Sequence, residues 1–252
     1  MATGLLAVMQ WFFYLLLRVF DEHKDWDTDH INFPERILSR GLVTLTHMKL
    51  LGFVCTLVLF LGSLWFGSPM LVWTAVLYAY ALLMLKEFFV AEWLKNHLFL
   101  YGISHNVIVF LSFHWVFAGF ASVSGVSSPW SVLNLSLFAI ALNSLIFSLE
   151  VARKIRLPEF EREGVDTYSQ VIGYRPATWL AVGVQALGLI LLYVSAPAIS
   201  LYAWLGLLIV LGGVIGIVVK FLRAPDETTA EKLSNPCALT VLATLLVLAF
   251  NL

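Results

Sequence analysis

The sequence predicts an all-α membrane protein, a polytopic bundle of about eight transmembrane helices. Of its 252 residues, 60% are hydrophobic and only 12% are charged, and the mean hydropathy is +0.89. Soluble globular chains carry about 25% charged residues, so this composition belongs to the membrane class. Apolar runs close to the ~20 residues that cross a bilayer recur along the chain. We expect one integral, multi-pass transmembrane domain over residues 1–252.

Eight apolar runs are long enough to be read as spans. Short links such as Gly67-Ser68-Pro69 join some of them, and longer charged segments join the others. The net charge is −1 and no basic tract is present, so nothing in the sequence indicates a nucleic-acid partner. The predicted spans lie at about 3–20, 47–66, 70–88, 100–122, 130–149, 176–196, 199–221 and 236–251.

The charged residues predict the topology. Every Lys, Arg, Asp and Glu falls in or beside four regions, at 18–49, 86–95, 153–175 and 220–232. With eight spans, all four regions lie on one side of the membrane, and the opposite loops carry no charge. Because basic loops stay on the inner side, we expect this charged face, and with it the active-site loops, to be cytoplasmic.

The first polar stretch, Arg18 to Thr44, contains three aspartates spaced four residues apart: Asp21, Asp25 and Asp29. On a helix this spacing stacks them along one face, each about one turn above the last. Carboxylates that close repel one another unless a cation lies between them. Hard divalent ions such as Mg²⁺ take carboxylate oxygens, usually one or two, together with substrate phosphates.

Two arginines, Arg36 and Arg40, follow the aspartates in the same stretch. The guanidinium group suits bidentate recognition of phosphate. The stretch therefore reads as half of a metal–diphosphate site. The competing interpretation is a solvated acidic loop next to the membrane, which the regular spacing and the arginines disfavour.

Residues 86–106 alternate charged and aromatic side chains. Such a segment is typical of an interfacial helix at the membrane surface. Two interpretations stay open, a surface connector with snorkelling lysines and a lid over the site.

The second polar stretch runs from Leu149 to Gly173. Taken alone, such a mixed-charge loop is usually solvated. Taken with the first stretch, it lies after a separate span on the same predicted face, as a paired metal–diphosphate site requires. Its charged residues are Glu150, Arg153, Lys154, Arg156, Glu159, Glu161, Arg162, Glu163 and Asp166.

These motifs resemble those of the UbiA-type intramembrane prenyltransferases. Residues 21–29, DEHKDWDTD, match the acidic spacing of that family's N-D-x-x-D-x-x-x-D motif, with Asp21 in place of the asparagine and Glu22 in place of the next aspartate. Residues 36–44, RILSRGLVT, resemble the run that follows it, and residues 164–173, GVDTYSQVIG, resemble a run in the later loop. The order of the motifs agrees over nearly the whole chain.

The resemblance implies a Mg²⁺-dependent enzyme. It would transfer a prenyl group from a prenyl diphosphate to a lipophilic acceptor, often aromatic or a quinone precursor, among membrane lipids. The implied catalytic residues are Asp21, Asp25 and Asp29. The implied metal ligands are Asp21, Glu22, Asp25, Asp29, Glu150, Glu159 and Glu163. The implied diphosphate-binding residues are Arg36, Arg40, Arg153, Lys154, Arg156 and Tyr168.

The sequence departs from the family pattern in two places. The family's second motif supplies aspartates about four residues apart, whereas this loop offers glutamates and basic residues, which allows fewer bound ions. The family has nine spans, and the helix that ends in the first motif begins near residue 1 here. We expect that the first span is absent or that the start is truncated.

Two other functions fit parts of this pattern. A membrane terpene cyclase would keep the ionisation and let the allylic cation cyclise. A non-enzymatic protein that binds or transports divalent cations would use the aspartates without chemistry. That reading predicts carboxylates at mid-bilayer depth, and the predicted spans contain none there.

Overall fold

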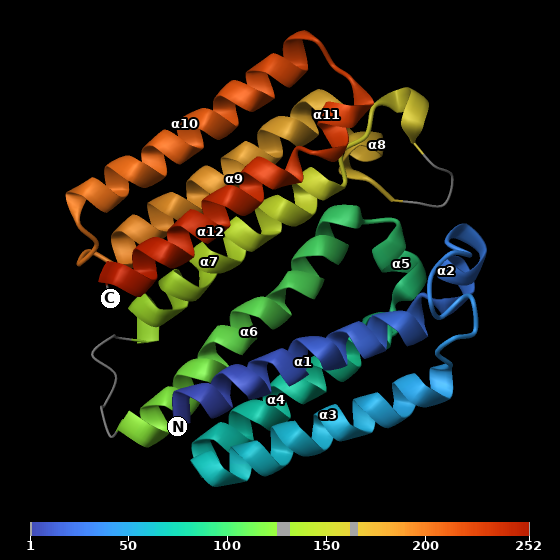
Figure 1. Ribbon diagram of the computed structural model, residues 1–252, viewed down its shortest axis with the longest axis vertical. Helices are drawn as coiled ribbons and strands as arrows, with labels where there is room; N and C mark the ends of the chain where they lie inside the picture. The colour runs from blue at the N-terminus through green and yellow to red at the C-terminus, as the bar shows by residue number, and fades with distance from the viewer. Residues whose placement is uncertain (1, 125–131, 162–165, 252) are drawn as a thin grey trace. The chain divides into compact units, whose positions relative to one another are not determined.

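The computed structural model describes residues 2–124, 132–161 and 166–251 (Figure 1). Across these ranges the chain folds into helices and contains no strand. Eight helices within them are long and apolar enough to cross a membrane, so the predicted all-α, multi-pass class is confirmed. The long helices are α1 (Ala2–Lys24), α3 (Leu45–Phe66), α4 (Ser68–Leu85), α6 (Leu98–Ser124), α7 (Val132–Arg153), α9 (Tyr174–Ser195), α10 (Leu201–Arg223) and α12 (Ser234–Asn251).

Short helices occupy the four charged regions that the sequence picks out. The predicted interfacial segment forms two of them, η1 and α5, ahead of α6. The first helix also continues beyond its predicted end at residue 20, so its last turns carry the first acidic residues of the motif. The short elements are α2 (Trp26–Asn32), η1 (Glu87–Phe89), α5 (Ala91–Lys95), η2 (Pro158–Phe160), α8 (Tyr168–Ile172) and α11 (Glu227–Glu231).

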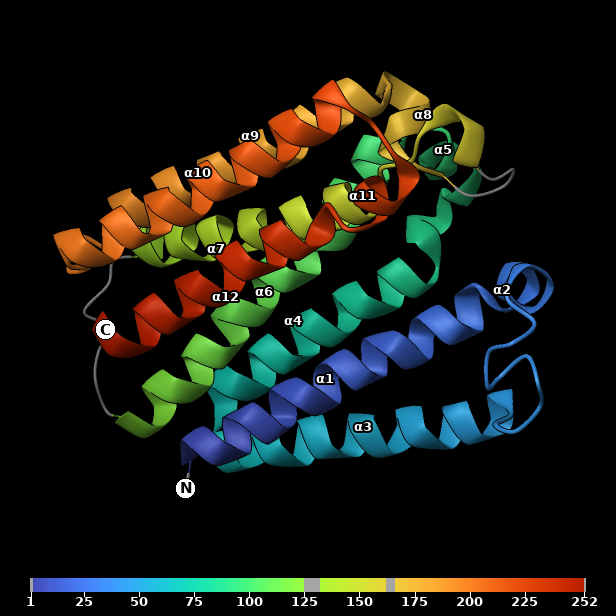
Figure 2. The same ribbon diagram turned by 45° about the horizontal axis from the view of Figure 1, so that its top comes forward.

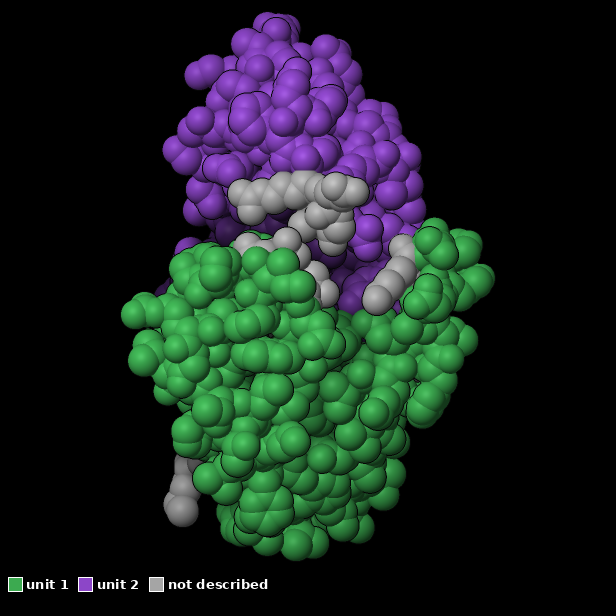
Figure 3. Space-filling model, turned by 90° about the vertical axis from the view of Figure 1, so that its right-hand side faces the viewer, with its two compact units in different colours: residues 1–97, 107–129 green, residues 98–106, 130–252 purple. Residues whose placement is uncertain are grey.

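The helices group into two compact units, which Figure 3 colours separately. Unit 1 comprises residues 1–97 and 107–129, and unit 2 comprises residues 98–106 and 130–252. Each unit has its own buried core. One transmembrane domain over residues 1–252 stays a prediction.

In unit 1, α1 lies beside α3 and α4 (Figures 1 and 2). Buried residues of α1 recur every three or four positions, which gives the helix one continuous packing face. A polar contact joins α3, α4 and α6. The indole of Trp115 donates to Thr74 Oγ1 at 2.6 Å, and Ser63 Oγ lies 2.5 Å from the same atom. Buried hydroxyl and indole groups between apolar helices are thereby satisfied. The face of α1 is formed by Leu6, Met9, Phe13 and Leu16.

In unit 2, α7 and α9 run side by side (Figure 1). Gly188 of α9 permits their close approach, because a Cβ there would lie 2.9 Å from the carbonyl oxygen of Ala141. The side-chain amide of Gln185 donates to the carbonyl oxygen of Cys237 at 3.3 Å, which ties α9 to α12. Small residues and buried amides of this kind are common where membrane helices pack.

The outer faces of the long helices are apolar. On α10, for example, Leu205, Leu208 and Ile209 are exposed, Ile209 to 76%. Such continuous apolar exposure is costly in water and is normal against lipid tails. The exposed side chains therefore agree with an integral membrane protein.

Candidate functional site

Asp21, Asp25 and Asp29 form a row, called here the aspartate row, at the junction of α1 and α2. Helix α1 ends at Lys24, and Asp25 caps α2 with a φ of −93° and a ψ of 4°. The helical hydrogen bonds nevertheless continue, because the amide of Asp25 donates to Asp21 O at 2.8 Å and that of Asp29 donates to Asp25 O at 2.8 Å. Consecutive members of the row are therefore one helical turn apart, as the spacing predicted.

Basic side chains lie beside the acidic residues of this motif. Arg18 pairs with Glu22, Arg36 pairs with Asp29, and Lys24 Nζ lies 4.0 Å from Asp25 Oδ1. Burial raises the pKa of Asp25 above its ordinary range, the charge of Lys24 opposes that rise, and the charges of Asp29 and Glu87 add to it. The surroundings of Asp25 therefore only partly compensate the negative charge of its ionised form.

A pocket of about 440 Å³, called here the arginine pocket, lies next to this motif. The guanidinium carbon of Arg36 lies 4.3 Å from the ring centroid of Phe33, so a cation–π contact as well as the pair with Asp29 holds this arginine. Two glutamates and two arginines line the same pocket, and this mixed charge suits an anionic ligand that binds together with a metal cation. Its lining residues are Arg18, Glu22, Glu35, Arg36, Ile37, Leu38, Val43 and Met48.

The carboxylates do not form an all-protein metal cage. Within the residues that the structure describes, no three His, Cys, Asp or Glu side chains come close enough to hold an ion together. Mg²⁺ commonly needs only one or two carboxylates and takes its other ligands from water and substrate phosphates. The aspartate row can supply one or two such carboxylates, and the charge of ionised Asp25 is only partly balanced by its surroundings, so the row fits a magnesium site of this kind.

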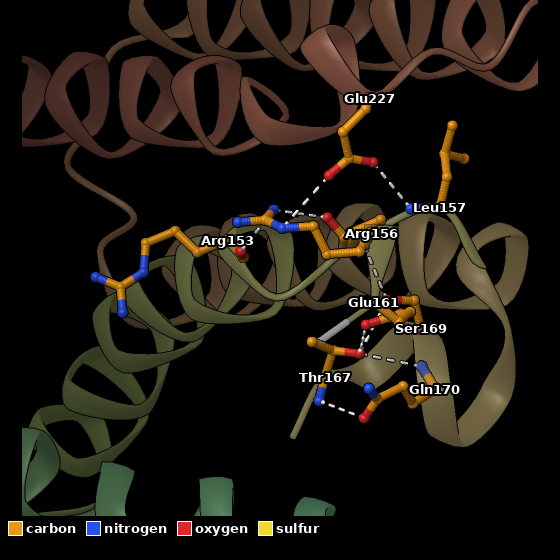
Figure 4. Close-up of polar contacts among 9 residues, drawn as sticks. Arg153, Arg156, Leu157, Glu161, Thr167, Ser169, Gln170 and Glu227 are labelled. Atoms are coloured by element: carbon orange, nitrogen blue, oxygen red, sulfur yellow. Dashed lines mark hydrogen bonds and ion pairs between the residues drawn. The ribbon is translucent and has the colours of Figure 1, made fainter. Parts of the chain in front are cut away.

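In unit 2, the second polar loop has its own charge pairs. Glu150, near the end of α7, pairs with Arg153 at 3.0 Å and with Lys154 at 3.2 Å. Arg156 does not pair with Glu150. Its Nε lies 3.4 Å from Glu227 Oε1, and its Nη1 donates to Ile155 O at 2.9 Å (Figure 4).

Glu227, the first residue of α11, also accepts the amide of Leu157 at 3.0 Å (Figure 4). One carboxylate therefore holds both the backbone and a side chain of a loop 70 residues earlier in the chain. Sequence reasoning missed this residue, since it lies in the last charged region and belongs to no recognisable motif. The signal available was an unassigned glutamate in that region.

The run that resembles the family's later motif folds as a capped helix. The hydroxyl of Thr167 donates to Glu161 Oε2 at 2.8 Å and accepts the amide of Gln170 at 3.2 Å, and the Gln170 side chain accepts the amide of Thr167 (Figure 4). Ser169 Oγ accepts the amide of Arg156 at 2.9 Å. This capping box begins α8 and fixes the loop against the end of α7.

Tyr168 lies inside the core of unit 2. It is fully buried, with its ring 5.3 Å from that of Phe99 and 6.4 Å from that of Phe147, measured between centroids. Burial, with a smaller contribution from the charge of Glu150, raises the pKa of Tyr168 to about 12. The hydroxyl is therefore neutral in the physiological range, and the ring contributes to the packing of the loop.

The structure brings together part of the set that the sequence predicts. In unit 1 it gathers Glu22 and Arg36 with the aspartate row, while Arg40 is exposed. In unit 2 it gathers Glu150, Arg153 and Lys154, while Glu159 is exposed on η2. Glu163 lies outside the described residues.

Comparisons with known proteins agree with these motifs. A model of the UbiA prenyltransferase family matches residues 1–250. A solved structure titled as a study of digeranylgeranylglyceryl phosphate synthase in membranes is similar with a TM-score of 0.61 and 18% identity, over 98% of this chain and 85% of that chain. At that identity the likeness bears on the fold. A search of curated proteins finds no match.

Proposed function

Because this chain belongs to the UbiA prenyltransferase family, we propose that it transfers a prenyl group from a prenyl diphosphate to a lipophilic acceptor, with Mg²⁺ as its cofactor. The observation that carries the proposal is the aspartate row, whose members follow one another at one-turn intervals across the junction of α1 and α2. A row of carboxylates beside an arginine-lined pocket suits a magnesium diphosphate.

Asp21, Asp25 and Asp29, with Glu22 beside them, are the residues that we propose hold Mg²⁺. When bound, the ion would neutralise the charge that develops on the departing diphosphate. The partial burial of Asp25 strengthens its interaction with a cation, because fewer water molecules compete there.

Arg36 is the residue that we propose binds the diphosphate oxygens in unit 1. Its contacts with Asp29 and Phe33 restrict the guanidinium before the substrate arrives, so little order has to be gained on binding. In unit 2, Arg153 and Lys154 are the predicted diphosphate-binding residues whose charges face Glu150. Arg156 is instead held by Glu227, and we give it a role in fixing the loop.

The reaction that we propose breaks the bond between the allylic carbon and the bridging oxygen, and the electron pair leaves with the diphosphate. A nucleophilic carbon or oxygen of the acceptor then bonds to the allylic cation and loses a proton. This reaction needs a site that keeps water from the cation, which would otherwise be captured as an alcohol. Aromatic and quinone-precursor acceptors are the class that the family resemblance favours.

The test is product formation by the purified protein in lipid. Prenyl diphosphates of several chain lengths are supplied with an aromatic acceptor, a quinone precursor, a glyceryl phosphate lipid or none, in Mg²⁺ or in EDTA. The proposal expects a prenylated acceptor and free diphosphate only when Mg²⁺ is present. A cyclic hydrocarbon made from the donor alone would establish the cyclase instead. Mg²⁺ binding without diphosphate release from any donor would point to the cation-binding function.

A further inference from the structure

Unit 1 contains a second, larger pocket, called here the lysine pocket. Its volume is about 650 Å³, and it lies where α1, α3 and α4 meet. It shares no lining residue with the arginine pocket. Its lining residues are Val19, Phe20, His23, Lys24, Lys49, Gly52, Phe53, Thr56, Tyr78, Leu85 and Lys86.

The rim of the lysine pocket is positively charged. Lys24 ends α1, Lys49 lies in the first turns of α3, and Lys86 caps the end of α4. Since these three spans alternate in direction, the C-terminal ends of α1 and α4 and the N-terminal end of α3 lie on the same side of unit 1, and so do the three lysines. Lys24 pairs with Glu87 at 3.2 Å, whereas Lys49 and Lys86 are exposed and make no ion pair within the described ranges.

The inside of the pocket is apolar with a few hydrogen-bonding groups. Thr56 Oγ1 donates to the hydroxyl of Tyr78 at 3.3 Å. His23 donates from Nδ1 to the carbonyl oxygen of Val19 at 2.8 Å, and its Nε2 is buried with no hydrogen-bond partner in the described part of the chain. Because Nδ1 carries the proton, Nε2 is an acceptor, and a buried acceptor without a partner favours a ligand that can donate to it, such as a headgroup hydroxyl.

Most of the lysine pocket lies off the face of α1 that carries the aspartate row, although Lys24 reaches that row, with its Nζ 4.0 Å from Asp25 Oδ1. Val19 and His23 each lie two residues from Asp21, which at about 100° per residue puts them on the opposite face of α1. Phe53, which lines the pocket, is also 60% exposed on the outer face of α3. The pocket therefore continues onto a surface that meets lipid tails.

We propose that the lysine pocket binds the phosphate headgroup of an anionic phospholipid from the surrounding membrane. Glu87 and Asp25 lie beside Lys24, whereas Lys49 and Lys86 have no ion pair among the described residues, so the rim keeps an excess of positive charge at the end of the spans where lipid headgroups lie. The apolar interior beneath them takes the first carbons of the acyl chains. A lipid held there packs against α1, α3 and α4 together and stabilises unit 1.

The test is native mass spectrometry of the full chain in a neutral detergent, titrated with phosphatidylglycerol or phosphatidylcholine. The wild type should bind phosphatidylglycerol more tightly than phosphatidylcholine. The double variant K49Q/K86Q should bind phosphatidylglycerol on the order of tenfold more weakly, because each basic residue near the headgroups adds several-fold. Each single variant should lose part of that affinity.

The control is K220Q/R223Q, which removes two exposed positive charges from the end of α10 in unit 2. It should bind phosphatidylglycerol like the wild type. Equal binding by K49Q/K86Q and the wild type would overturn the proposal. So would a loss of prenyl diphosphate binding in K49Q/K86Q with phosphatidylglycerol binding intact, because the pocket would then serve the donor. Both readouts are independent of catalysis, so failure of the proposed prenyl transfer leaves this test valid.

Discussion

The ammonium group of Lys24, at the end of α1, lies 3.2 Å from Glu87 Oε1 in η1, and the two side chains are only 14% and 11% exposed. The pair joins the first motif to the segment between α4 and α6. Glu87 also begins a strained stretch of backbone, in which Glu87, Phe88 and Phe89 have φ values of 49°, 53° and 61°. Consecutive non-glycine residues with positive φ values are costly, and contacts with their surroundings must hold them in that conformation.

Glu87→Gln is expected to destabilise unit 1. Removing one charge of a largely buried pair leaves Lys24 with weaker compensation and releases the strained segment, at a cost of about 3 kcal/mol. Thermal unfolding in detergent measures the change. Glu92→Gln is the matched control, because Glu92 is an exposed glutamate in the short helix α5 that follows η1, and it should leave the unfolding temperature unchanged. Equal unfolding temperatures for wild type and Glu87→Gln would contradict the role of the pair.

Asp25→Asn is expected to stabilise the metal-free protein at neutral pH. The folded structure raises the pKa of Asp25, so this group contributes stability below its unfolded pKa, and that stability is lost as the pH rises through the folded value. An asparagine cannot acquire the unfavourable charge. Unfolding in EDTA across the acidic to neutral range measures the effect, and a lower stability of Asp25→Asn at neutral pH would refute the prediction.

Mg²⁺ affinity is expected to fall as the pH is lowered, because the ion and the proton compete for the carboxylate of Asp25. Since the pKa of this group is raised, the fall should begin at a higher pH than an ordinary aspartate would give. Calorimetric titration of Mg²⁺ at several pH values measures the dependence. In Asp25→Asn the remaining affinity should depend less on pH, and an unchanged pH profile would exclude Asp25 as a ligand.

Glu227→Gln is expected to loosen the second polar loop. The variant loses the charge that holds Arg156, and it weakens the acceptor for the Leu157 amide. Hydrogen exchange of the peptide that contains residues 154–161 should become faster. Glu231 is an exposed residue of the same short helix, so in Glu231→Gln this peptide should exchange at the wild-type rate. Protection that survives in Glu227→Gln would show that the loop is held by other contacts.

The features that depend on local pattern were predictable from the sequence. Hydropathy located the eight spans, because each helix must satisfy its own backbone inside the bilayer. The four-residue spacing predicted the aspartate row, since the helical hydrogen bonds carry on through Asp25.

The contacts between distant segments were not predictable in this way. Glu227 meets Arg156 and Leu157 across 70 residues of chain, and no local spacing encodes such a contact. The family resemblance implies that Tyr168 binds the diphosphate, which stays a prediction, and the structure packs this ring, just after the capping residue Thr167, into the core of unit 2. A tyrosine in a polar loop has the same neighbours in sequence whether it binds substrate or packs into a core.

The central claim is tested most directly by diphosphate release from Asp25→Asn beside Asp27→Asn. Asp27 lies on the same short helix as Asp29, is exposed and is outside the aspartate row. Asp27→Asn therefore removes the same charge as Asp25→Asn without touching the row. With Mg²⁺ and a prenyl diphosphate donor, we expect Asp27→Asn to release diphosphate like the wild type and Asp25→Asn to lose most of its activity, about a hundredfold or more. Equal release by the two variants would contradict a diphosphate site built on the aspartate row.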